Sequence, residues 1–237
     1  MATIELQSKN SVTAKSGFKA EEIFRTCPDI KSALETYFGK RICSVDKIHG
    51  KKYDTKICFE NGSFKNIQNK KIEKLGGRGD SFDRRHIKDT FHNSFIRKYL
   101  TVLTLIRKSK FKTEMSPCQK LDFIKLCNDN IHDIKDYIRK TLLGEEPEKN
   151  EFWCIMKTNK DFTNKELYII SSETLLDFIE KSVNIDIKLK TNGTNLHLSP
   201  HIALQRKGGT KTDHSPNHIQ AKFKFTQEIL DLCTRIL

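Results

Sequence analysis

The residues best suited to chemistry lie in one short stretch, from Asp54 through Asn61-Gly62-Ser63 to Gln68-Asn69-Lys70. Apolar residues on both sides of the turn predict two strands, over residues 53–59 and 64–72, that form a hairpin. A carboxylate, an amide oxygen and a backbone carbonyl are the hard oxygen ligands that Mg²⁺ prefers. An amine beside them can orient or help deprotonate a water, or stabilise charge on a phosphate. The stretch therefore predicts a metal site that activates water beside a phosphate.

The hairpin can do this chemistry only if its three side chains meet. Gln68 and Lys70 are two residues apart on a strand and share a face. A two-residue turn at Asn61-Gly62 would place Asp54 opposite Asn69, on the wrong face. A three-residue turn over residues 61–63 would place Asp54 opposite Lys70, with Gln68 diagonal to it. The chemistry therefore requires the longer turn or a bulge in one arm; otherwise this is an amphipathic surface hairpin.

Other periodic patterns give the elements around the hairpin. Residues 17–39 are predicted to be helical, with a second helical segment beginning at Pro28, and residues 41–48 are predicted to form a strand. Long helical patterns run from Phe82 to Leu103 and from Ser116 to Gly144. Further strands are expected over residues 152–156, 167–170, 185–189 and 202–206, a helix after Ser171 or Ser172, and a last helix from near Thr226 to the chain end. These elements predict an α/β (α+β) fold, with helices flanking a mixed sheet.

The charge of the chain is strongly positive. Lys and Arg number 43 against 30 Asp and Glu, and the isoelectric point is near 9.4. Residues 62–112 hold fourteen Lys or Arg and only four Asp or Glu. Such a concentration fits either a surface that binds a polyanion such as nucleic acid or a solvated basic surface.

Other features bear on the cellular setting. The seven cysteines are odd in number and contain no CxxC pair, which is typical of a reduced cytoplasmic protein rather than a disulfide framework. No apolar run approaches the ~20 residues of a membrane span. The N-terminus lacks a charged-then-apolar signal pattern. We therefore expect a cytoplasmic protein with no membrane partner.

Beyond this chemistry, the hairpin resembles the active site of the PD-(D/E)XK nucleases, in the variant where Gln replaces the acid before x-Lys. Three segments are similar to the small type II restriction endonucleases of the HinP/MspI group. They are Glu5–Lys9 with Ala14–Lys19, then Lys52–Asp54 with Asn66–Lys70 running on to Gly79, and finally Leu198–Pro200, Leu204–Gly209 and Asn217–Lys222.

The resemblance implies a PD-(D/E)XK nuclease-like fold, as a single endonuclease domain over residues 1–237. Residues 1–112 would hold the catalytic hairpin and a basic helix, and residues 113–237 helices plus a DNA-reading strand region. It implies a Mg²⁺-dependent enzyme, monomer or homodimer, that cuts double-stranded DNA at a four-base palindrome beside a companion DNA methyltransferase. Asp54, Gln68 and Lys70 carry over as catalytic residues, with Asp54, Gln68 and Asn69 as metal ligands. Glu22 or Glu21 is a candidate assisting acid.

A second set of residues is suited to reading DNA. An Arg fork matches guanine and a Gln amide matches adenine, while Lys residues position the duplex through its phosphates. The expected DNA-binding residues are Arg78, Ser81, Arg84, Arg85, Gln205, Arg206, Lys207, Asn217, Gln220 and Lys222. Relatives often carry an Asn-Gln pair after the catalytic Lys, and residues 80–86 here have none, so we expect a different recognised sequence. Phe82 is a candidate wedge between bases or a core residue.

Two other functions fit the same residues. One is a nicking or repair nuclease of the same fold, which would cut single strands or require a partner protein. The other is a non-enzymatic DNA- or RNA-binding protein in which Asp54 and Lys70 are merely solvated.

Overall fold

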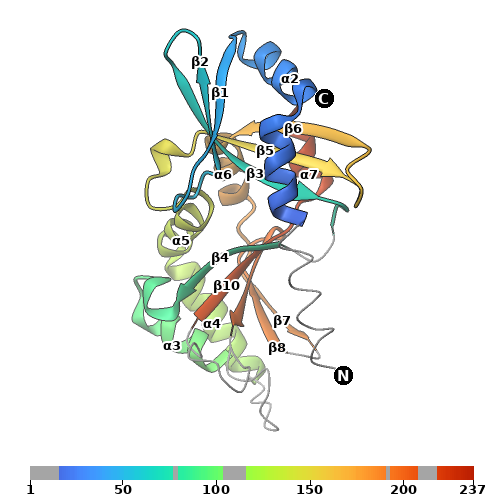
Figure 1. The fold of residues 1–237 in the computed structure, drawn as a ribbon. Helices are drawn as coiled ribbons and strands as arrows, with labels where there is room; N and C mark the ends of the chain where they lie inside the picture. The colour runs from blue at the N-terminus through green and yellow to red at the C-terminus, as the bar shows by residue number, and fades with distance from the viewer. Residues whose placement is uncertain (1–15, 77–79, 104–115, 191–192, 208–217) are drawn as a thin grey trace, which may run out of the picture. The chain divides into compact units, whose positions relative to one another are not determined.

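The computed structural model describes residues 16–76, 80–103, 116–190, 193–207 and 218–237 (Figure 1). The chain forms two compact units, each built from separate segments. The first unit comprises Met1–Leu75, Leu143–Leu175 and Gln227–Leu237, and the second comprises Gly76–Leu142 and Leu176–Thr226. The single endonuclease domain expected from the sequence stays a prediction.

The first unit is built on a six-stranded mixed sheet. Only β3 and β5 run parallel, and every other neighbouring pair is antiparallel. The strand order is β1 (Ile42–Lys47), β2 (Thr55–Phe59), β3 (Phe64–Ile72), β5 (Phe152–Thr158), β6 (Lys165–Ser171) and β11 (Thr234–Arg235). The expected α+β fold, a mixed sheet flanked by helices, is confirmed.

Helices cover one face of this sheet. A helix over residues 16–26 is followed by α2 (Pro28–Phe38), which begins at the expected proline and ends at Gly39 in a left-handed conformation. Phe24, Leu34 and Ile67 belong to the buried cluster that these helices share with the strands. The helices therefore pack against β3, the strand that carries Gln68 and Lys70.

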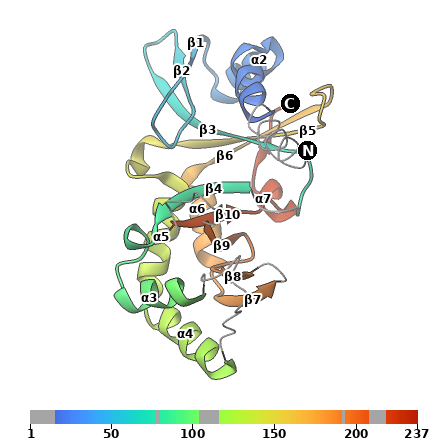
Figure 2. The ribbon, with the colours of Figure 1, turned by 60° about the horizontal axis from the view of Figure 1, so that its bottom comes forward.

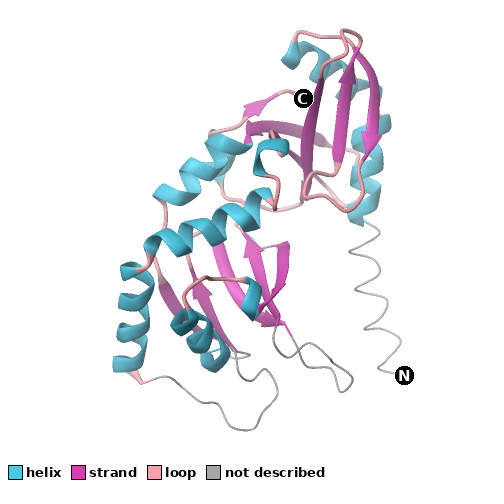
Figure 3. Ribbon diagram, turned by 90° about the vertical axis from the view of Figure 1, so that its left-hand side faces the viewer, coloured by secondary structure: helices cyan, strands magenta, loops and turns pink. Residues whose placement is uncertain are grey.

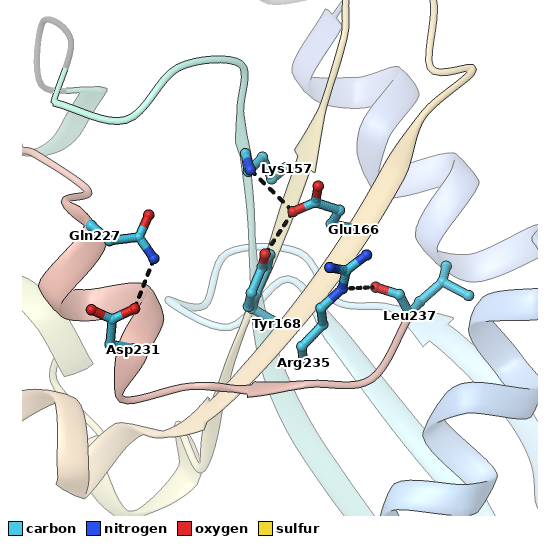
Figure 4. Close-up of polar contacts among 7 residues, drawn as sticks. All are labelled: Lys157, Glu166, Tyr168, Gln227, Asp231, Arg235 and Leu237. Atoms are coloured by element: carbon cyan, nitrogen blue, oxygen red, sulfur yellow. Dashed lines mark hydrogen bonds and ion pairs between the residues drawn. The ribbon is translucent and has the colours of Figure 1, made fainter.

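The far edge of the sheet is closed by the C-terminal residues. Thr234 pairs with Ile169 and Arg235 with Tyr168, where β11 joins β6. Figure 4 shows the polar contacts at this edge: Lys157 and Tyr168 both bond to Glu166, at 3.1 and 2.6 Å. The last helix, α7 (Gln227–Asp231), is only five residues long. The expected helix to the chain end is wrong, because the final residues pair with β6 instead.

The second unit holds a five-stranded antiparallel sheet. Figure 2 shows its strands in the order β4 (Asp80–His86), β10 (His218–Phe223), β9 (Ile202–Lys207), β8 (Gly193–His197) and β7 (Asp186–Lys190). Figure 3 shows helices (cyan) along one side of these strands (magenta).

The remaining helices of the two units are α3 (Ser94–Leu103), α4 (Pro117–Asp129), α5 (Ile131–Leu143) and α6 (Ser172–Lys181), with short 3₁₀ helices η1 (Ile87–Asp89) and η2 (Pro147–Lys149).

The long helix expected from Phe82 to Leu103 is wrong in its first half. Residues 80–86 form β4, because they pair along their length with β10, and Phe82 packs against Phe223 with ring centroids 5.5 Å apart. The helix begins only at Ser94, where the Asn93 side chain accepts from the Phe95 and Ile96 N–H groups. Pairing with a distant strand overrides the local helical period here.

The helix expected from Ser116 to Gly144 is two helices. Ser116 and Gln119 form a reciprocal capping box at the start of α4, as the Ser-Pro pair suggested. The first helix ends before Asn130, which leaves the helical conformation, and α5 begins at Ile131. Within the described part of the chain, every helix is too short or too polar to cross a bilayer.

Candidate functional site

The site begins with the turn that joins β2 and β3. The Phe59 N–H donates to Ser63 O and the Gly62 N–H to Phe59 O, both at 2.9 Å, which closes a three-residue loop over Glu60–Gly62. Gly62 has a φ of 79°, a left-handed conformation that costs glycine little. The turn therefore has the predicted length but lies one residue earlier than residues 61–63.

The strand arm before the turn contains the bulge that the chemistry allowed for. Thr55 is the partner of Ile67 in the ladder, yet the Asp54 N–H also donates to Ile67 O, at 3.0 Å. Two residues of one arm thus face one residue of the other. The Asp54 carbonyl accepts from the Ile48 N–H at 2.9 Å, so the backbone of Asp54 is held from both sides.

The Asp54 carboxylate lies against the middle of β3. Its Oδ2 accepts from the Asn69 backbone N–H at 3.0 Å. The N–H and C=O of one strand residue point to the same neighbouring strand, so the Asn69 carbonyl is also directed toward the Asp54 side. Two of the three expected metal ligands therefore converge where the β2–β3 ladder ends.

Burial and the charges around Asp54 shift the pKa of its carboxyl in opposite directions. Burial raises the pKa of this carboxyl above its ordinary value, whereas the Lys70 ammonium and the bond from Asn69 lower it. The charge of Glu21 also raises this pKa, and Lys52 lowers it. The carboxylate is thus poorly solvated, with a cation from β3 beside it, and a divalent metal would further favour its ionised form.

The two candidate assisting acids are placed differently. Glu21 acts on Asp54 through its charge and also pairs with Lys47, at 3.2 Å. Glu22 is exposed on the same helix. The structure therefore associates Glu21, rather than Glu22, with the Asp54 carboxylate.

Gln68 is held by Asn150, a residue that no sequence motif singled out. It is 2% exposed, and its Oε1 accepts from Asn150 Nδ2 at 3.2 Å. The next residue, Glu151, accepts from the Asn66 N–H at 3.1 Å through its carboxylate. Both contacts follow from the parallel pairing of β3 with β5, which places Gln68 beside Trp153. Only that pairing could have identified Asn150.

The donors suit Mg²⁺ better than a soft metal. Asp54 offers a carboxylate, Asn69 a main-chain carbonyl and Gln68 an amide oxygen, all hard ligands. Among the residues that the structure describes, no group of three or more His, Cys, Asp or Glu could hold a metal. Mg²⁺ commonly keeps several waters and binds through one or two carboxylates plus substrate phosphates, so a single carboxylate fits this ion.

Several expected DNA-binding residues share one face of the second unit's sheet. Gln205, Gln220 and Arg84 occupy matching positions on β9, β10 and β4. Arg84 is exposed, whereas Gln205 Nε2 donates to Gln220 Oε1 at 3.1 Å within the sheet. Lys222 follows Gln220 by two residues on β10 and is half-buried. The structure brings these four residues onto one polar face.

Arg85 belongs to the opposite face. Its Nε pairs with Asp83 at 2.6 Å, and its Nη2 donates to the Lys140 carbonyl of α5 at 3.1 Å. These contacts join β4 to a helix, so the described geometry ties Arg85 to packing rather than to the polar face.

The other expected DNA contacts are less fully described. Arg78 and Asn217 lie outside the described residues. Ser81 lies in β4 and Arg206 and Lys207 in β9, but the described side chains do not include theirs. The DNA-binding roles of this set stay predictions.

Comparisons with known proteins add a fold likeness. No protein-family model matches the chain, and no curated protein matches it. Among solved structures, the chain is similar to the restriction endonuclease MspI in complex with its cognate DNA, with 12% sequence identity and a TM-score of 0.45. The alignment covers 82% of this chain and 77% of that chain. A likeness of this degree carries no argument about function, which rests on the geometry above.

Proposed function

We propose that this protein is a Mg²⁺-dependent endonuclease that hydrolyses phosphodiester bonds of double-stranded DNA at a short specific site, as type II restriction enzymes do. The observation that carries the proposal is the poorly solvated Asp54 carboxylate, bonded to the Asn69 N–H beside the Lys70 charge. A four-base palindromic site and a companion methyltransferase belong to the same proposal, on the strength of the sequence resemblance.

Each proposed site residue of the hairpin has a part in this reaction. Asp54, the Asn69 carbonyl and Gln68 would hold Mg²⁺. When bound, Mg²⁺ supplies a more acidic water and neutralises charge on the phosphate. Lys70 orients the attacking water and stabilises the negative charge that develops on the phosphate oxygens. Glu21 adds a carboxylate whose charge reaches Asp54.

The substrate class follows from charge. The chain carries a formal net charge of +13, and one sheet face of the second unit carries exposed Arg84 and half-buried Lys222 and Gln205 beside the buried amide of Gln220. Cations suit phosphates, and amides suit base edges. This combination favours a nucleic acid over a small anionic substrate.

Digestion of long unmodified DNA tests the activity directly. The protein is incubated with the DNA and Mg²⁺, and the ends of the products are sequenced. We expect discrete fragments whose ends share one short sequence, which also reveals the site and the stagger of the cut. Uncut DNA, or ends without a common sequence, would contradict a sequence-specific endonuclease. Single-strand cuts would favour the nicking nuclease.

Replacement of Lys70 tests the catalytic assignment. Lys70→Ala should keep DNA binding, measured without Mg²⁺, and lose cleavage by about a hundredfold or more, the effect of removing a group that stabilises developing charge. Lys56→Ala is the matched control, because Lys56 lies in the same hairpin, where it stacks on exposed Phe64. It should cut normally. Unchanged cutting by Lys70→Ala would remove Lys70 from the reaction.

A further inference from the structure

Gln68 and Asn150 form a buried amide pair. Their exposed fractions are 2% and 1%, and the bond between Asn150 Nδ2 and Gln68 Oε1 measures 3.2 Å. An amide NH₂ group can only donate, so Asn150 faces the oxygen of Gln68 and not its nitrogen. A buried amide that loses such a partner is left unsatisfied, which strongly favours one orientation of the Gln68 side chain.

The segment that carries Asn150 is itself anchored to the sheet. The Asn150 N–H donates to Pro147 O at 3.2 Å, at the end of η2. Glu151 binds the Asn66 N–H through its carboxylate and the Ser172 N–H through its carbonyl, at 3.1 and 2.9 Å. The backbone that carries the Asn150 side chain is therefore held in place by bonds that do not involve Gln68.

We propose that Asn150 is a positioning residue, which orients the Gln68 oxygen for the metal and so sets the metal affinity of the site. The inference rests on the proposed function. A carbonyl oxygen has two lone pairs, so one can accept from Asn150 while the other faces a cation. Gln68 is neutral and contributes to binding through the placement of its dipole rather than through net charge. Loss of the partner that orients a metal ligand commonly weakens binding.

Direct measurement of metal binding tests this role without relying on activity. Mn²⁺ serves as a paramagnetic probe, and free Mn²⁺ is counted by electron paramagnetic resonance in titrations of the full chain. Asn150→Leu keeps the branched shape and the number of heavy side-chain atoms, and it removes the donor without adding charge. We expect its dissociation constant for Mn²⁺ to rise about 10- to 100-fold. The Mg²⁺ concentration for half-maximal cleavage should rise in parallel.

Glu151→Gln is the matched control, since it weakens the neighbouring anchor without touching the Gln68 bond. Its Mn²⁺ affinity should stay within about threefold of the wild type, well below the effect of losing a ligand's orienting partner. Equal affinities in Asn150→Leu and wild type, or equal losses in both variants, would overturn the positioning role. If circular dichroism shows that Asn150→Leu does not fold, Asn150→Ser is measured in its place.

The outcome also separates this inference from the proposed function. Wild-type protein that binds Mn²⁺ but cuts no DNA removes the endonuclease, while the shift in Asn150→Leu still decides the role of Asn150. Wild-type protein that binds no Mn²⁺ overturns both.

Discussion

Asp54 is less stable as a charged group in this fold than in water. Burial is the main cause, and it raises the pKa of the carboxyl. The folded chain therefore binds this proton more tightly than the unfolded chain does. The free energy of unfolding that Asp54 contributes is lost as pH rises through the ordinary carboxyl range to the raised pKa. Above the raised pKa, the ionised carboxylate is unfavourable to folding and available to a metal.

Asp54→Asn should accordingly stabilise the fold and abolish cleavage. The amide oxygen can still accept from the Asn69 N–H, while the poorly solvated charge is gone. We expect a higher midpoint of thermal unfolding at pH 7 without metal, with the gain shrinking as pH falls through the raised pKa. The control is Asp46→Asn, which removes a charge from the exposed side of β1. A lower midpoint for Asp54→Asn would show that the ionised carboxylate supports the fold.

Among the elements, the β2–β3 hairpin decides whether the site exists. The loop over Glu60–Gly62 sets the pairing of Thr55 with Ile67, and the bulge then brings Asp54 to the same partner. β3 pairs with β2 from Phe64 to Ile67 and with β5 from Ile67 to Ile72, so a neighbouring strand holds its backbone along its whole length. Gln68 and Lys70 thus lie on a central strand, and Asp54 directly precedes β2, where hydrogen bonds hold its backbone; this arrangement favours a rigid site.

The second unit offers a paired test on one strand, because Arg84 and Arg85 of β4 lie on opposite faces. Arg84→Ala should weaken binding to any duplex about equally and lower the slope of log affinity against log salt by about 1. Arg85→Ala should leave that slope unchanged and reduce the free energy of unfolding by about 1–3 kcal/mol, since it leaves Asp83 and the Lys140 carbonyl without this cation. Fluorescence anisotropy measures the affinity for DNA at each salt concentration, and thermal unfolding measures the change in stability. The reverse pattern would exchange the roles assigned to the two faces.

For the molecule as a whole, the proposed binding of DNA depends first on the positive net charge of the chain. Binding of a duplex should weaken steeply with salt, because each neutralised phosphate releases condensed counterions. If about six phosphates are contacted, affinity measured in EDTA should fall about a thousandfold between 50 and 200 mM salt. Affinity that does not change over this range would contradict a DNA-binding role for the basic surface.

Local patterns in the sequence were enough to predict the hairpin and the helices near the start of the chain. They also indicated the chemistry that Asp54, Gln68 and Lys70 could perform. Strand alternation, turn residues and helix-capping residues act over a few neighbours, so they can be read without the fold. The same patterns misassigned residues 82–93, because the pairing of β4 with β10, which places Phe82 against Phe223, outweighs the local helical spacing.

Tertiary structure alone decided which groups meet. The pairing of β4 with β10 and the bond between Gln68 and Asn150, 82 residues apart, depend on strands that find partners far along the chain. The bulge at Asp54 depends on the register of the whole hairpin. Register between distant strands is set by burial and hydrogen bonding over the whole sheet, and no local spacing records it. The sequence by itself therefore determined which chemical groups the site contains, and the fold determined how they are held.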